Sequence, residues 1–80
     1  MNTIIDRARE QARELYGNIP CNYKIATRNG YWYESTTSIK ILNLDEGQCC
    51  SFISKEKNTP VLIAIDSIET VCIIPGINLS

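Results

Sequence analysis

Three consecutive aromatic residues stand near the middle of the chain, with basic residues on both sides. Tyr31, Trp32 and Tyr33 follow Arg28, and Lys40 comes further on. Exposed aromatic side chains stack on nucleic-acid bases for about 1–3 kcal/mol each, and neighbouring cations hold the phosphate backbone. On a strand, Tyr31 and Tyr33 share one face and Trp32 takes the other. The alternative interpretation is that at least one of these faces packs inside the domain or against another subunit.

Other reactive groups are scarce in the sequence. The chain has no histidine, so it has no Ser–His or Cys–His pair and no imidazole metal ligand. The cysteines match neither a C-x-x-C pair nor a zinc site, and we interpret them as small apolar residues in a reduced compartment rather than as a disulfide pair. These four residues are Cys21, Cys49, Cys50 and Cys72. The sequence therefore predicts no enzyme, no metal site and no cofactor.

The charge balance is close to neutral. Eight Lys and Arg stand against nine Asp and Glu among 80 residues, which gives a net charge of −1. Such a chain lacks the basic field of a protein that holds nucleic acid by charge alone. The first residues lack the apolar region of a signal peptide, and no apolar run approaches the ~20 residues that span a bilayer. We expect a folded, cytoplasmic protein without membrane contact.

The segment from about residue 3 to residue 16 predicts an amphipathic helix. Thr3 is a suitable N-cap, and Asp6 adds favourable charge to the first turn and pairs with Arg9. We interpret the polar face, with its mixed charges, as solvated rather than as a phosphate site, although three arginines lie on it: Arg7, Arg9 and Arg13. One apolar stripe consists of Ile4, Ile5, Ala8, Ala12, Leu15 and Tyr16.

After Pro20 the apolar period changes from 3.6 to 2, which predicts five antiparallel strands over about residues 20–75. The first strand ends at Asn29-Gly30, a signal for a type I′ hairpin turn. The second runs from Tyr31 to about Leu44, with a polar stretch over 34–38 that projects or bends. The remaining strands are 48–54, 61–65 and 69–74, and residues 77–80 form a short tail. The fold class is mainly β: an N-terminal helix and a five-stranded, strongly bent antiparallel sheet in one domain, 1–80.

The last two strands are too apolar for so small a domain. An 80-residue chain cannot easily cover both faces of two such strands, and an apolar edge invites pairing with another chain. We therefore expect a head-to-tail subunit interface that closes into a ring. Its residues are Val61, Leu62, Ile63, Ala64 and Ile65 in one strand and Val71, Cys72, Ile73 and Ile74 in the other.

The order of these landmarks resembles the Sm-like family of small β-barrels, which includes the LSm and Hfq-like proteins. Cys21–Thr27 followed by Arg28-Asn29-Gly30 is similar to the first strand and turn of the Sm1 motif. Leu44-Asp45-Glu46 and Cys49–Ile53 resemble the acidic turn and third strand of that motif. The segment 66–75 is similar to the Sm2 motif, in which a short turn joins strands four and five.

The resemblance implies a homo-oligomeric ring in which strand four of one subunit pairs with strand five of the next. Family rings have five to eight subunits, and we expect five to seven here. The resemblance also implies that single-stranded RNA binds at two turns, which correspond to Asp45, Glu46, Gly47, Asp66 and Ser67.

The second turn departs from the family pattern. Ile65-Asp66 stands where Hfq-like proteins carry a Lys-His pair, and a carboxylate repels phosphate. Two functions therefore stay open. One is an RNA-binding Sm-like ring, and the other is a ring or SH3-like module that binds protein or acts structurally without RNA.

Overall fold

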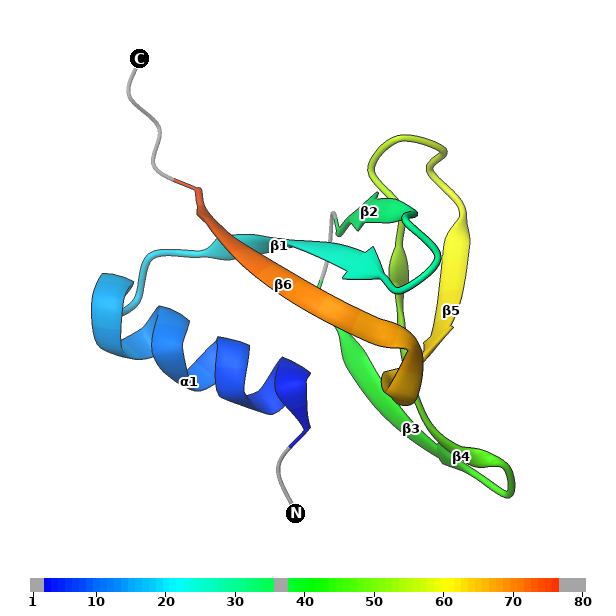
Figure 1. The fold of residues 1–80 in the computed structure, drawn as a ribbon. Helices are drawn as coiled ribbons and strands as arrows, with labels where there is room; N and C mark the ends of the chain where they lie inside the picture. Colours follow the sequence, from blue (N-terminus) through cyan, green and yellow to red (C-terminus); the bar gives the residue numbers. More distant parts are fainter. Residues whose placement is uncertain (1–2, 36–37, 77–80) are drawn as a thin grey trace.

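The computed structural model describes residues 3–35 and 38–76. These residues form one α-helix and six strands, and the strands make two three-stranded antiparallel sheets (Figure 1). The mainly β fold class with an N-terminal helix is confirmed. The predicted tail, 77–80, lies outside the described residues, as do Thr36 and Thr37 of the polar stretch.

The helix, α1, spans Ile4–Tyr16 and begins at the predicted cap. The Thr3 hydroxyl accepts the Asp6 N–H at 3.2 Å, and the Asp6 carboxylate accepts the Thr3 N–H at 3.0 Å. This reciprocal pair satisfies two N–H groups that a helix start leaves unbonded. α1 packs mainly on the last strand, and its buried residues are Ile5, Ala8 and Ala12; Leu15, although part of the predicted stripe, is exposed.

Each sheet has one central strand and two edge strands. In the first sheet, β1 (Cys21–Thr27) lies between β2 (Trp32–Glu34) and β6 (Ile68–Pro75). In the second sheet, β4 (Gly47–Ile53) lies between β3 (Lys40–Leu44) and β5 (Pro60–Ala64). A short 3-10 helix, η1 (Ile65–Ser67), joins β5 to β6 and so links the two sheets (Figure 1).

The prediction of one long second strand, and hence of five strands, is wrong. The segment from Tyr31 to Leu44 is divided into β2 and β3, which belong to different sheets. Ser35 closes the first sheet: its N–H donates to the Tyr23 carbonyl at 3.0 Å, and its hydroxyl accepts the Tyr23 N–H at 3.1 Å. Ser35 is fully buried, so this part of the polar stretch does not project from the protein. The chain passes here from the first sheet to the second, and side chains of both sheets form the one core.

The turn after β1 also differs from the prediction. The Gly30 N–H donates to the Thr27 carbonyl at 3.0 Å, and the Thr27 N–H donates to the Tyr31 carbonyl at 2.9 Å. The loop therefore has three residues, 28–30, and only Gly30 has a positive φ, +89°. A three-residue loop needs one such residue, whereas a type I′ turn needs two. The added residue lets the Arg28 N–H donate to the Ser67 carbonyl at 2.9 Å, which ties this turn to η1.

The core lies between the inner faces of the two sheets and under the start of α1. Its buried side chains come from every layer: Ile5, Ile25, Ile39, Cys50, Phe52, Ile63 and Ile68. Adjacent residues of a strand face opposite sides, and accordingly Cys50 is buried whereas its neighbour Cys49 is half-buried.

Candidate nucleic-acid interface

The outer face of the first sheet carries the exposed Trp32, and the exposed Tyr31 directly precedes β2. The pairing register places Trp32 opposite Ala26 and Glu34 opposite Lys24. Trp32 is 46% exposed and Tyr31 is 63% exposed. The Lys24 Nζ lies 5.3 Å from the centre of the Trp32 ring, which is a cation–π contact. We call Lys24 and Trp32 the Trp32 patch; it offers an aromatic face for stacking and a cation beside it.

Lys24 was missed by sequence reasoning because the predicted turn shifts the register. A two-residue Asn29-Gly30 loop pairs Thr27 with Trp32, and Lys24 then stands opposite Ser35. The observed three-residue loop pairs Ala26 with Trp32 and Lys24 with Glu34. Lys24 is therefore the diagonal cross-strand neighbour of Trp32, on the same face of the sheet. The signal that identifies Lys24 is therefore the alternation of β1 together with the correct loop length.

Glu34 borders the patch and is paired. The Lys55 Nζ lies 3.1 Å from a Glu34 carboxylate oxygen, and the Lys55 N–H donates to the Glu34 carbonyl at 2.7 Å. An exposed ion pair of this kind contributes little to stability. Its consequence is local: it offsets the negative charge of Glu34 next to Trp32, and it places the Lys55 cation on this side of the molecule.

Two other candidates of the aromatic cluster, Tyr33 and Lys40, lie elsewhere, and Arg28 is exposed in the loop after β1. Tyr33 stands opposite Ile25 and packs on the core, as the alternative interpretation of the aromatic run expects for one face. Lys40 is exposed, but it lies on β3 opposite Ser51, in the second sheet. The division of the predicted long strand therefore separates Lys40 from the sheet that carries Trp32.

The two turns that the family resemblance implies as the RNA site lie at the same end of the β4–β5 pair. Cys49 of β4 pairs with Ala64 of β5, so the β3–β4 turn and η1 both lie just past this pair. The Ser67 hydroxyl donates to the Ala64 carbonyl at 2.8 Å. The residues of the two turns are Asp45, Glu46, Gly47, Asp66 and Ser67. The Arg28 backbone N–H is hydrogen-bonded to the second turn, at the Ser67 carbonyl. Three carboxylates and one nearby arginine make this region a poor phosphate site.

The predicted interface strands are both sheet edges. β5 pairs only with β4, and β6 pairs only with β1, within residues 3–35 and 38–76. Leu62 is 58% exposed, and Ala64 is exposed on the same face of β5. Cys72 is exposed on β6, in the first sheet. Ile63 instead packs in the chain's own core. The remaining predicted interface residues are half-buried: Val61, Ile65, Val71, Ile73 and Ile74.

The cysteines are all free thiols in the structure. Burial raises the pKa of Cys50 to about 11, so this thiol stays protonated and unreactive at neutral pH. In the part of the chain that the structure describes, no group of three or more Cys, Asp or Glu could hold a metal ion. The one helix there is too short and too polar to cross a membrane.

Comparison with protein-family models, curated proteins and solved structures gives no significant match for this chain.

Proposed function

We propose that this chain is an Sm-like small β-barrel protein that assembles into a closed ring and binds single-stranded RNA through the Trp32 patch. The observation that carries the RNA proposal is the exposed indole of Trp32, with the Lys24 ammonium 5.3 Å from its centre. An aromatic face beside a cation suits an unpaired base together with its phosphate.

The arrangement of the strands supports the assembly half of the proposal. The edges of β5 and β6 belong to different sheets, and each leaves backbone groups unpaired along one side. Because the two edges differ, pairing β5 of one copy with β6 of the next is head-to-tail, and a head-to-tail contact whose rotation closes makes a ring. Pairing at these edges covers Leu62, whose exposure in a single copy is otherwise costly.

The proposed RNA site differs from the one the family resemblance implies. Asp45, Glu46 and Asp66 repel phosphate, whereas the Trp32 patch has Lys24 at its centre and a charge-compensated Glu34 at its border. Since the whole chain has a net charge of −1, stacking rather than charge supplies most of the affinity. A ring strengthens weak contacts because several copies of the patch act on one strand.

A ring or SH3-like module that binds protein is the second candidate. Its supporting observation is the outer face of the second sheet, where Leu42, Leu44 and Leu62 are all exposed. Together with the acidic turns, this apolar face fits a protein partner better than a nucleic acid.

A fluorescence anisotropy titration tests the RNA proposal. Labelled U-rich and A-rich oligonucleotides are titrated with the protein at low and at moderate salt. Trp32→Ala removes one stacked base, so we expect it to weaken binding by about 1–3 kcal/mol, which is about fivefold to more than a hundredfold. Lys24→Gln has a smaller effect, which shrinks as salt is added.

Two variants control for general surface effects. Leu44→Ala removes a residue with the same exposed fraction as Trp32, 46%, from the other sheet, and Lys57→Gln removes an exposed cation from the loop after β4. Neither changes the affinity if the patch is the site. Absence of binding at low salt contradicts the RNA proposal and favours the protein-binding candidate.

A further inference from the structure

A groove separates α1 from the beginning of β1, on a different part of the molecule from the Trp32 patch. It consists of two adjoining cavities of about 570 and 220 Å³. Arg9, Cys21 and Tyr23 line both cavities and therefore stand where they meet. The larger cavity also has Asn22 and Ile39 in its wall, and its volume is in the range of small-molecule sites. We call this the α1–β1 groove.

The groove is positively charged in a chain whose net charge is −1. Arg9 lines both cavities and Arg13 lines the smaller one. Among the residues that the structure describes, no Asp or Glu lines either cavity. Two guanidinium groups without a carboxylate in the same wall favour an anion, and guanidinium geometry suits a phosphate.

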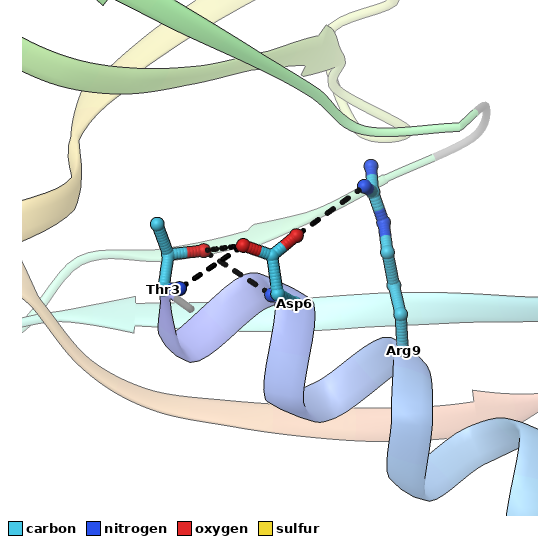
Figure 2. Close-up of polar contacts among 3 residues, drawn as sticks. All are labelled: Thr3, Asp6 and Arg9. Carbon is cyan, nitrogen blue, oxygen red and sulfur yellow. Dashed lines mark hydrogen bonds and ion pairs between the residues drawn. The ribbon is translucent and has the colours of Figure 1, made fainter. Parts of the chain in front are cut away.

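Arg9 is held only loosely by its own helix. The closest approach of its guanidinium to the Asp6 carboxylate is 4.0 Å. Figure 2 shows that the other Asp6 oxygen is occupied by Thr3, while the Arg9 side chain extends away from the helix. A stronger acceptor in the groove can therefore bind Arg9 without breaking the helix cap.

The wall opposite Arg9 provides a neutral donor and an apolar surface. Tyr23 is half-buried, and burial raises the pKa of its hydroxyl, an effect that the nearby Arg9 charge partly offsets. The hydroxyl therefore stays protonated at neutral pH. The side chain of Pro20 supplies apolar surface in the larger cavity.

We propose that the α1–β1 groove binds a small phosphate monoester, with the phosphate on Arg9 and Arg13 and the organic part in the larger cavity against Tyr23 and Pro20. A nucleoside monophosphate and a sugar phosphate share this chemistry. The site is separate from the proposed RNA surface, and it uses arginines that sequence reasoning assigned to a solvated helix face.

Backbone-amide NMR on the intact protein tests the proposal. The shifts of Gly17, Cys21, Asn22 and Tyr23 are followed during titration with adenosine 5′-monophosphate and with glucose 6-phosphate. Inorganic phosphate, adenosine and glucose are titrated in parallel. We expect saturable shifts with at least one monoester, with an affinity about tenfold or more above those of inorganic phosphate and of the neutral parent. The monoester that binds more tightly shows whether the larger cavity prefers a nucleoside or a sugar.

Arginine variants locate the site. Arg9→Gln weakens monoester binding by about tenfold or more, because it removes a charge-assisted contact, and Arg9→Lys, which keeps the charge but not the planar fork, weakens it less. Arg7→Gln is the matched control, since Arg7 is exposed on the same helix and lines neither cavity. The dispersion of each amide spectrum shows whether the variant is folded.

The outcomes also separate this site from the RNA surface. Trp32→Ala leaves monoester binding unchanged, and Arg9→Gln leaves oligonucleotide affinity unchanged. The proposal is overturned if no monoester produces saturable shifts, if inorganic phosphate binds as tightly as the monoesters, or if Arg7→Gln weakens binding as much as Arg9→Gln does. It is also overturned if Arg9→Gln weakens oligonucleotide binding while no monoester binds.

Discussion

Asp6 has three hydrogen-bond contacts with one residue at the start of α1. Its carboxylate accepts from both the Thr3 N–H and the Thr3 hydroxyl at 3.0 Å, and its own N–H donates to that hydroxyl at 3.2 Å (Figure 2). The hydrogen bonds from the Thr3 backbone and side chain hold the pKa of Asp6 below its ordinary value, with a smaller contribution from the Arg9 charge. The cap therefore depends on an ionised carboxylate.

The cap predicts how stability changes with pH. Because the pKa of Asp6 is lower in the folded state, its contribution is fully present above the unfolded value of about 4 and is lost as pH falls through the folded value. Urea unfolding at neutral pH should show that Asp6→Asn lowers the free energy of unfolding. The difference from the native chain should shrink as pH is lowered through this window.

Two further variants complete the measurement at the helix start. Thr3→Ala should cost about 1 kcal/mol at neutral pH, as the loss of an N-cap does. Asp45→Asn, in the exposed β3–β4 turn, is the control and should leave the pH profile unchanged. A constant difference between the native chain and Asp6→Asn at all pH values would show that the carboxylate charge plays no part.

At the scale of elements, the junction between β2 and β3 decides the architecture. Ser35 is fully buried and bonds to both backbone groups of Tyr23, while its Cα lies opposite Ser54 in an isolated bridge. One residue thus ends the first sheet and touches the end of the second sheet's central strand. A side chain larger than serine has no room at a position of zero exposure.

Removing the Ser35 hydroxyl should destabilise the fold without changing its surface. Ser35→Ala leaves the part-buried Tyr23 N–H without its partner, so we expect a loss of about 1 kcal/mol in the free energy of unfolding, measured in urea. Ser51→Ala is the matched control, because Ser51 is half-buried on the outer face of β4, and it should change stability by less than about 0.5 kcal/mol. Equal effects of the two substitutions would contradict the role assigned to Ser35.

At the scale of the whole molecule, the β5 and β6 edges and an exposed apolar face bear on assembly. β5 ends the second sheet, and its outer residues Leu62 and Ala64 continue the apolar surface that Leu42 begins on β3. β6 ends the first sheet, with Cys72 exposed on its outer face. A head-to-tail ring brings these edges together and covers part of that surface.

The ring has a direct test in the mass of the particle. Light scattering at micromolar concentration should give a multiple of the 9.0 kDa chain, with five to seven copies expected. Leu62→Glu places a charge beside the β5 edge and should shift the particle towards monomer while circular dichroism stays unchanged, because Leu62 is 58% exposed in a single copy.

Leu44→Glu controls for a charge on the same face away from that edge, since Leu44 lies at the far end of β3, and it should leave the mass unchanged. A 9.0 kDa monomer for the native chain would eliminate the ring.

Short-range chemistry made the helix, the turn at Asp45-Glu46 and the last three strands predictable from sequence. A cap, an apolar period and a glycine act over a few residues, so Thr3 and the apolar run from Val61 were enough. The candidate site was predicted in part: Trp32 and Tyr31 are exposed, but Lys24 was missed and Lys40 lies on the other sheet.

The sequence by itself determined the mainly β class, the helix cap, the apolar edges and the absence of histidine chemistry, because these depend on residue type and local period. Only the tertiary structure decided the rest. The loop length at 28–30 set the register that joins Lys24 to Trp32, the burial of Ser35 divided a polar stretch between two sheets, and the packing of α1 opened a groove beside Arg9. Each of these depends on contacts between residues distant in the chain, where packing overrides local preference.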